Sequence, residues 1–157
     1  MALKLLIDTR EIKPLEFPVR QGVDVLRQGL TAGDYTALHQ HGTIEQLDPT
    51  VFERKSIPDL FSSFTAGYDQ EKAKWSRLMD MGLAYILAVE GTASEVLKGH
   101  TYWAQGERHE AKKSGLAQLR QLLSVMRRYG LHIWFCSSRQ EMALLILEYF
   151  LAKEREP

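Results

Sequence analysis

The chain passes from a strand into a helix at Val51–Asp59, which reads VFERKSIPD. Side chains of an extended strand alternate between two faces, so Glu53 and Lys55 point to one side and Arg54 to the other. Carboxylates bind hard cations, and an ammonium group positions water and offsets the charge of a phosphate. Two carboxylates and a lysine in this short stretch therefore suit phosphodiester hydrolysis.

The same residues also have a purely structural explanation. Ser56 followed by Asp59 fits a capping box, in which Ser56 is the N-cap and Asp59 lies in the first helical turn. Charged runs are usually solvated surface, so these nine residues alone leave both interpretations open.

Two earlier segments favour the chemical interpretation. Leu3–Ile7 is a short apolar run typical of a buried strand, and it ends in Asp8-Thr9-Arg10-Glu11. A second run, from Val23, leads into Gly33-Asp34-Tyr35. With Glu53-Arg54-Lys55-x-x-x-Asp59, these pieces resemble the XPF family of structure-specific DNA endonucleases, whose signature is G-D, a variable gap and then E-R-K-x-x-x-D. The resemblance covers nearly the whole chain and concerns the nuclease domain of that family.

Length and composition fit one domain over residues 1–157. The chain is 45% apolar and 25% charged, with a net charge of zero, which argues against indiscriminate coating of nucleic acid. No stretch is apolar enough to span a bilayer, and the start lacks the pattern of a signal peptide. Cys136 is the single cysteine, which excludes an internal disulfide. An intracellular, cytoplasmic protein is expected.

Apolar runs and turn residues predict an α/β layout. The expected strands are residues 3–7, 23–28, 35–39, 51–55, 84–89 and 131–136. The expected helices are residues 57–64, 68–81, 92–99 and 114–129, and a last one that opens at Ser138. Early strands in hairpin-like succession and later strands alternating with helices predict a mixed sheet between helical layers. The resemblance implies the same arrangement, a restriction-endonuclease-like core with a central mixed β-sheet flanked by α-helices.

The resemblance also implies a magnesium-dependent site in which Mn²⁺ can substitute. Asp34 and Glu53 are the expected direct ligands, with a backbone carbonyl and waters completing the coordination. Lys55 is expected to orient or activate the attacking water. Further acids would hold a second metal or act through water, and arginines would pair with them or touch phosphate. These further candidates are Asp8, Asp59, Glu11, Arg10 and Arg54. The number of metals stays open.

Side chains outside the motif are candidates for DNA contact. Gln70 and Arg77 are seven residues apart on one face of an expected helix, where they can position the scissile strand. Residues 107–128 hold six basic side chains against two acidic ones. Segment 100–113, expected to be a loop, combines aromatic and basic residues, which suits stacking on bases and contact with phosphates. The basic candidates here are Arg108, Lys112 and Lys113. A solvated surface remains the alternative.

The last helix is apolar almost all round from Met142 to Leu151. One face should cover the sheet, and another is free to meet a partner. Nuclease domains of the XPF type dimerise, so the resemblance implies a homodimer that forms through the C-terminal helices. A helix wholly buried within its own monomer is the alternative.

Many XPF relatives carry helix-hairpin-helix modules after the nuclease domain, and no such signature occurs in residues 1–157. The chain is most similar to stand-alone nuclease domains of bacteria and their phages. We expect cleavage of branched DNA, such as flaps, forks or junctions, in repair or recombination. Two alternatives stay open. One is a non-catalytic DNA-binding or scaffold subunit, and the other is a restriction or resolvase nuclease of the same fold, which need not keep Gly33 or Arg54.

Overall fold

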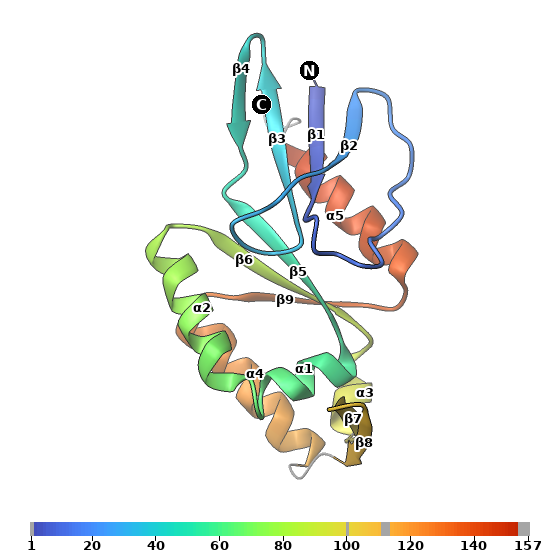
Figure 1. Ribbon diagram of the computed structural model, residues 1–157, viewed down its shortest axis with the longest axis vertical. Helices are drawn as coiled ribbons and strands as arrows, with labels where there is room; N and C mark the ends of the chain where they lie inside the picture. Colours follow the sequence, from blue (N-terminus) through green and yellow to red (C-terminus); the bar gives the residue numbers. More distant parts are fainter. Residues whose placement is uncertain (1, 100, 111–113, 154–157) are drawn as a thin grey trace.

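In the computed structural model, which describes residues 2–99, 101–110 and 114–153, a seven-stranded sheet forms the centre of the fold (Figure 1). The order is β2-β1-β3-β5-β6-β9, and β4 pairs with β3 outside this path. The strands are β1 (Ala2–Ile7), β2 (Val23–Arg27), β3 (Tyr35–His41), β4 (Ile44–Leu47), β5 (Thr50–Ser56), β6 (Ala84–Glu90) and β9 (His132–Cys136). Strand β3 runs antiparallel to β1 and β5, whereas β1–β2 and β5–β6–β9 are parallel. The predicted mixed sheet is therefore confirmed.

Hydroxyl side chains begin most of the helices. Ser56 Oγ accepts the N–H of Asp59 at 3.2 Å, and Thr92 forms a reciprocal capping box with Glu95. Ser114 Oγ accepts the N–H of Ala117 at 3.2 Å and caps the fourth helix. The helices are α1 (Ile57–Ser63), α2 (Tyr68–Asp80), α3 (Ala93–Leu97), α4 (Gly115–Tyr129) and α5 (Arg139–Lys153). Their bounds lie within a few residues of those predicted, because local capping and turn residues set them.

Strand β6 divides the apolar interior into two clusters. Alternate residues of this continuous apolar strand point to opposite faces of the sheet. Ile86 and Ala88 pack with the buried side chains of α5, from Met142 to Phe150. Leu87 and Val89 pack with the buried side chains of α1, α2 and α4. The sheet is thereby covered on both faces, which explains why β6 carries no polar alternation.

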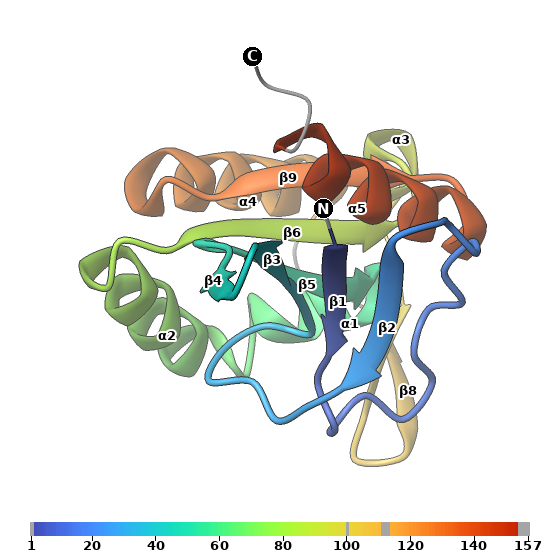
Figure 2. The same ribbon diagram turned by 90° about the horizontal axis from the view of Figure 1, so that it is seen from above.

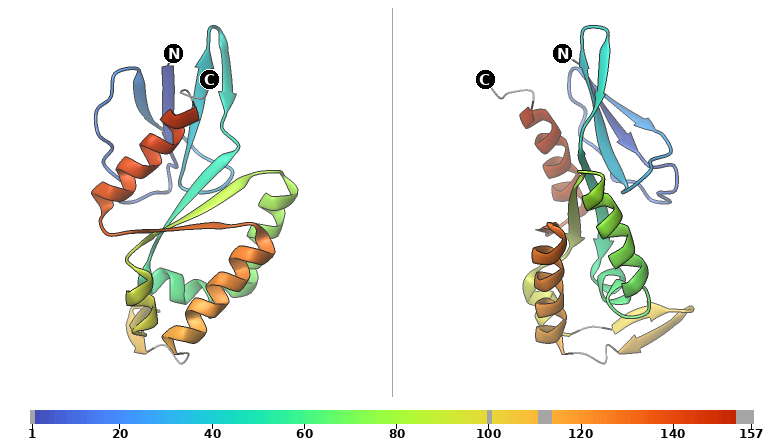
Figure 3. Two further views of the ribbon diagram at one scale, coloured as in Figure 1. Left: turned by 180° about the vertical axis from the view of Figure 1, so that it is seen from behind. Right: turned by 90° about the vertical axis from the view of Figure 1, so that its left-hand side faces the viewer.

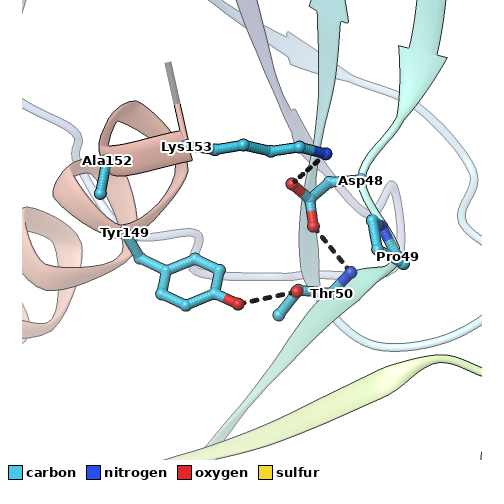
Figure 4. A pocket seen from close by; sticks show the side chains of 6 residues that line it. All are labelled: Asp48, Pro49, Thr50, Tyr149, Ala152 and Lys153. Atoms are coloured by element: carbon cyan, nitrogen blue, oxygen red, sulfur yellow. Dashed lines mark hydrogen bonds and ion pairs between the residues drawn. The ribbon is translucent and has the colours of Figure 1, made fainter. Parts of the chain in front are cut away.

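Helix α5 is fastened to β5 by aromatic and polar contacts. The Phe52 ring lies at 5.3 Å from the ring of Tyr149 in an edge-on arrangement. Figure 4 shows Tyr149 and Lys153 reaching toward the start of β5, where Tyr149 OH lies 2.8 Å from Thr50 Oγ1 and Lys153 Nζ lies 3.6 Å from Asp48 Oδ2. These residues border a cavity of about 320 Å³. These contacts hold the start of β5 against α5, and the charged motif residues follow at the other end of the strand.

The β7–β8 hairpin (residues 101–110) and strand β4 differ from the sequence prediction. The segment expected to be a loop contains a hairpin, β7 (Thr101–Ala104) and β8 (Glu107–Glu110), with Gln105 at a positive φ of 54° and Gly106 in its turn. Strand β4 was also missed, because its four residues are all exposed and lack an apolar face. In α4, Leu116 and Leu123 are exposed, whereas Gln118, Leu122 and Val125 are buried.

The elements separate into two ends of the molecule. Figure 3 shows β1 to β4 with α5 at one end, and α1, α4 and the β7–β8 hairpin at the other. Seen from above, the hairpin extends on the side of the sheet away from α5 (Figure 2). No helix in the described part of the chain combines the length and the apolar character that crossing a membrane requires.

Candidate active site

Strand pairing brings the acidic motif residues to one place. Ile7 at the end of β1 pairs with Tyr35 at the start of β3, and Tyr35 pairs with Phe52 in β5. Residues next to these partners in sequence must therefore lie near one another across the sheet. The acidic residues brought together in this way are Asp8, Asp34 and Glu53.

The two faces of β5 carry different charged networks, as strand alternation predicts. On the α2 side, Lys55 Nζ lies 3.9 Å from Glu53 Oε1. On the other side, Arg54 lies between two carboxylates, with Nε at 3.5 Å from Glu11 Oε2 and Nη1 at 3.7 Å from Glu90 Oε2. Arg54 thus ties β5 to neighbouring segments, while Glu53 and Lys55 stand together on the α2 side.

Asp34 is held by backbone hydrogen bonds on both sides. Its N–H donates to the carbonyl of Phe52 at 2.7 Å, and its own carbonyl accepts the N–H of Asp8 at 2.8 Å. Its Oδ2 accepts the N–H of Arg54 at 2.8 Å. Gly33 makes this approach possible, because it has a φ of +71° and an added Cβ would lie 3.0 Å from the carbonyl oxygen of Phe52. The glycine of the motif therefore places the aspartate beside β5.

The charge of Asp34 is costly in this position. Burial raises the pKa of Asp34 to about 7, and the carboxylates of Glu11 and Glu53 add to that rise, while the N–H of Arg54 opposes it. Desolvation and the negative charge of neighbouring carboxylates both disfavour the ionised form of a carboxyl group. A bound cation relieves both, so the shift marks a point at which positive charge is stabilised.

Asp8 organises the turn after β1. Its Oδ2 accepts a hydrogen bond from Arg10 Nε at 2.6 Å, and its Oδ1 accepts the N–H of Leu30 at 3.1 Å. Arg10 in turn donates to the Leu30 carbonyl at 3.1 Å. The Asp8 side chain is buried, whereas most of Arg10 is exposed. These bonds use Nε and Nη2 of Arg10, and most of its side chain stays exposed to solvent.

Glu11 connects the segment after β1 to the opposite face of β5. Tyr35 OH donates to Glu11 Oε2 at 2.8 Å and accepts the N–H of Leu15 at 3.0 Å. Burial raises the pKa of Tyr35, so its hydroxyl keeps the proton that it donates. Glu11 also pairs with Arg54. Tyr35 is fully buried, and its hydrogen bonds hold Glu11 in place relative to β3 and β5.

Helix α2 adds two charged residues to the Glu53 side. Lys74 Nζ lies 3.0 Å from both Glu53 oxygens and 2.8 Å from Glu71 Oε2. Lys55 Nζ lies 3.6 Å from Glu71 Oε1 and donates to Ser63 Oγ at 2.9 Å. Positive and negative groups alternate among these side chains, so each charge has an opposite neighbour.

An open hollow of about 320 Å³ lies over the motif residues. Its walls combine the acids with basic side chains from the turn after β1 and from α2. The lining residues are Asp8, Arg10, Thr31, Ala32, Gly33, Asp34, Glu53, Lys74 and Arg77. A hollow with carboxylates at its base and cations on its rim suits a cation together with an anionic ligand.

The donors in the hollow suit a hard cation such as Mg²⁺, because they are carboxylate oxygens. Within residues 2–99, 101–110 and 114–153, no three acidic, His or Cys side chains are arranged as a ready metal cluster. Asp34 and Glu53 would hold the ion as a pair, so water and backbone carbonyl groups would supply the remaining ligands. Lys74 against both oxygens of Glu53 already demonstrates that a cation is stabilised at this carboxylate.

The other predicted residues lie at different distances from the hollow. Arg77 lines it, whereas Gln70 is exposed two turns earlier on α2 and is not among the lining residues. Asp59 has an exposed side chain in the first turn of α1, where its N–H is capped by Ser56. Arg108 is exposed on β8. The remaining two candidates, Lys112 and Lys113, fall outside the described residues.

Sequence reasoning missed Glu71 and Lys74. The signal was present in the helix period, since residues 71, 74 and 77 recur at i, i+3 and i+6 on one side of α2. Trp75 and Leu78, beside this row, are buried against the sheet. Charged residues beside the buried face of a helix lie at the edge of its contact with the sheet, where their side chains can reach Glu53.

Comparison with known proteins agrees with this geometry. The model of the ERCC4 domain matches residues 7–149. The structure of XPF from Aeropyrum pernix is similar at a TM-score of 0.65 and 21% identity, covering 98% of this chain. The same protein in complex with DNA gives a TM-score of 0.63 and 20% identity. This chain spans 66% of the length of either structure.

At such identity, the structural likeness establishes the restriction-endonuclease-like fold, and the sequence model establishes the family. No match was found among curated protein sequences. The matched segment contains the G-D pair, the E-R-K-x-x-x-D motif and helix α2, each of which contributes residues to the lining of the hollow. The chain belongs to the ERCC4 domain family, and its fold is that of the XPF structures.

Proposed function

We propose that this protein is a magnesium-dependent endonuclease that hydrolyses phosphodiester bonds in branched DNA. The observation that carries the proposal is the convergence of Asp34 and Glu53 at one hollow of an ERCC4 domain, with Lys55 Nζ 3.9 Å from Glu53 Oε1. Strand pairing and the Gly33 turn hold these groups together, and arginines stand on the rim. Branched substrates imply a role in repair or recombination.

Asp34 and Glu53 are the proposed direct ligands of Mg²⁺, and Mn²⁺ can substitute. A divalent ion bound there would polarise the phosphate and lower the pKa of a bound water. Asp8 and Asp59 are proposed to act through water rather than by direct contact. For Asp8, this is supported by the hydrogen bonds that already engage both of its oxygens.

Lys55 is proposed to orient the attacking water and to offset charge on the phosphate. Its ammonium group is restrained by Ser63 Oγ at 2.9 Å, and it lies within 4 Å of Glu53 and Glu71. A restrained donor loses little conformational freedom when it contacts the reacting group. Arg54 serves a different purpose, because its contacts with Glu11 and Glu90 hold β5 in place.

Arg10 and Arg77 are proposed to contact the phosphates that flank the scissile bond. Both line the hollow, and both are exposed. Planar guanidinium groups bind phosphate oxygens through paired N–H donors. The solved complex of Aeropyrum pernix XPF contains DNA, which supports DNA as the ligand of this fold. Gln70, Arg108, Lys112 and Lys113 are proposed as more distant contacts with the duplex.

A homodimer through the C-terminal helices is part of the proposal. Leu144 and Leu145 on α5 are 41% and 39% exposed, and Leu116 and Leu123 on α4 are exposed as well. Apolar residues left in water on helices favour association. Light scattering at micromolar concentration tests this point. A molar mass near the 18.0 kDa of one chain would contradict the dimer.

The decisive experiment incubates the protein with labelled flap, fork, Holliday-junction and linear duplexes, with and without magnesium. We expect magnesium-dependent cleavage of the branched substrates that Asp34→Ala or Lys55→Ala abolishes. The matched controls are Asp80→Ala and Lys72→Ala, which remove the same charges from α2 outside the hollow. Unchanged cutting by the Asp34 and Lys55 variants would refute the site. Binding without cleavage by the unaltered protein would favour a scaffold subunit instead.

A further inference from the structure

Four charged side chains form a closed ring on the α2 side of β5. Glu53 contacts Lys74 at 3.0 Å, Lys74 contacts Glu71 at 2.8 Å, and Glu71 contacts Lys55 at 3.6 Å. The ring closes between Lys55 and Glu53 at 3.9 Å. All four side chains are mostly buried, at 15% to 23% exposure. Each carboxylate therefore depends on the two ammonium groups for its compensation, since little water reaches it.

Within this ring, Lys74 occupies the part of Glu53 that a metal would use. Its Nζ is equidistant from the two carboxylate oxygens, at 3.0 Å from each. A divalent ion that binds Glu53 must approach the same oxygens and would then lie beside the Lys74 ammonium. Two positive charges a few ångströms apart in a partly buried place repel strongly. The ion and the ammonium therefore compete for Glu53.

Lys74 also has a second carboxylate to which it can move. Glu71 lies one helical turn away on α2 and already contacts the same ammonium group. Leaving Glu53 therefore does not leave Lys74 without a partner.

We propose that Lys74 is a resident counter-ion of Glu53 that a divalent cation displaces toward Glu71. Displacement of Lys74 then sets the metal concentration at which the hollow is loaded. In the absence of metal, the same lysine offsets the charge of Glu53 and stabilises the fold. Lys74 is thus a positioning residue, and this inference rests on the proposed function of the hollow as a metal site.

The first test measures Mn²⁺ binding by isothermal titration calorimetry without DNA. Lys74→Gln removes the competing charge, so we expect Mn²⁺ to bind roughly tenfold more tightly than to the unaltered protein, within the usual range of coupling between two sites. The matched control is Lys72→Gln on the same helix, whose lysine pairs with Asp69 at 3.0 Å. Its affinity should be unchanged. An unchanged or weaker affinity of Lys74→Gln would overturn the proposal.

A third variant distinguishes displacement of Lys74 by the metal from a general effect of positive charge near the hollow. Arg77→Gln removes a positive charge from the wall of the same hollow but leaves the contact of Lys74 with Glu53 intact. We expect its effect on Mn²⁺ affinity to be below about twofold, because exposed charges are screened by salt. An equal gain in the Arg77 and Lys74 variants would identify a field effect and refute specific competition.

A second readout needs no substitution. Amine acetylation followed by mass spectrometry reports the accessibility of each lysine in the folded protein. Adding Mg²⁺ or Mn²⁺ should raise the reactivity of Lys74, because its ammonium leaves Glu53, while Lys72 serves as the internal reference. Lack of any change at Lys74 under saturating metal would overturn the proposal. This measurement also decides the matter if Lys74→Gln fails to fold.

The two proposals fail in different ways. If the unaltered protein binds no Mn²⁺ and cuts no DNA, the proposed function fails, and the inference fails with it. If the unaltered protein binds Mn²⁺ and cuts DNA, but Lys74→Gln binds the ion no more tightly, the role of Lys74 alone is refuted. Circular dichroism of every variant confirms that the comparison is made between folded proteins.

Discussion

The backbone N–H of Arg54 donates a hydrogen bond to Oδ2 of Asp34 at 2.8 Å, across 20 positions of sequence. This bond joins the two halves of the family signature, since Asp34 belongs to the G-D pair and Arg54 to the E-R-K run. It uses the main chain of Arg54, so it does not depend on the arginine side chain. The position of Asp34 therefore depends on the backbone path at Gly33 and along β5.

Replacing Gly33 by alanine should damage both folding and cleavage. At a φ of +71°, a Cβ would lie 3.0 Å from the Phe52 carbonyl oxygen and 3.0 Å from Val51 Cβ, so strain and crowding combine. We expect the free energy of unfolding to fall by roughly 1–3 kcal/mol in urea titrations. Gly42→Ala is the control, because Gly42 has a φ of +65° with open space around it. An equal loss in both variants would contradict the crowding argument.

The metal-free protein should lose stability as pH rises toward neutrality because of Asp34. Its pKa is about 7 in the folded state against an ordinary value of 3.8, so the folded state binds more protons in that window. The contribution is therefore complete below about pH 4 and is lost as pH rises through about 7, with an upper limit of about 4 kcal/mol. Urea titrations in a chelator at several pH values measure it.

The control for this pH dependence is Asp34→Asn, which cannot ionise. The difference in unfolding free energy between the unaltered protein and this variant should decrease from about pH 4 to about pH 7. A difference that stays constant across that window would show that Asp34 titrates normally. Saturating Mg²⁺ should oppose the loss, because a bound cation stabilises the ionised carboxylate.

Tyr35→Phe should destabilise the protein by removing the hydrogen bonds of Tyr35 with Glu11 and Leu15. The substitution removes the hydroxyl that donates to Glu11 and accepts the N–H of Leu15, leaving two polar groups without that partner. We expect a loss of about 1–3 kcal/mol in the free energy of unfolding. Tyr149→Phe removes a hydroxyl that contacts Thr50 and provides the comparison. A smaller loss for Tyr35→Phe than for Tyr149→Phe would argue against the network.

Variants at the start of α1 distinguish the two interpretations of Asp59. Ser56→Ala removes the N-cap and should cost about 1 kcal/mol of stability with cleavage retained. Asp59→Asn should reduce cleavage on the order of tenfold, the usual effect of a group that acts on a metal through water. Asp34→Asn should cost considerably more. Full activity of Asp59→Asn would assign Asp59 to the helix start alone.

Local patterns predicted most of the elements correctly. Helix bounds follow from Ser56, Thr92 and Ser114 as caps and from Gly130, whose φ of 65° ends α4. The β7–β8 hairpin escaped prediction because its short strands have no apolar alternation, and the residues of β8 are mostly exposed. The buried face of α4 is also a tertiary property, since leucines at helical spacing lie on both its exposed and its buried sides.

In the candidate site, too, relations within one strand were predictable and contacts between separate elements were not. The alternation of β5 predicts that Glu53 and Lys55 share a face, because that relation lies within one strand. The contacts of Lys74 with Glu53 join residues 21 positions apart, through the packing of α2 on the sheet. The ring of Glu53, Lys74, Glu71 and Lys55 therefore could not be derived from a motif.

The order of residues along the chain was enough to identify the family and the strand that carries its chemistry, because both depend on short-range spacing and alternation. The tertiary structure decided which carboxylates become neighbours, how deeply Asp34 is buried and which cation stands at Glu53. Those properties depend on distances between separate elements, and such distances arise when the sheet register and the packing of α2 bring those elements together.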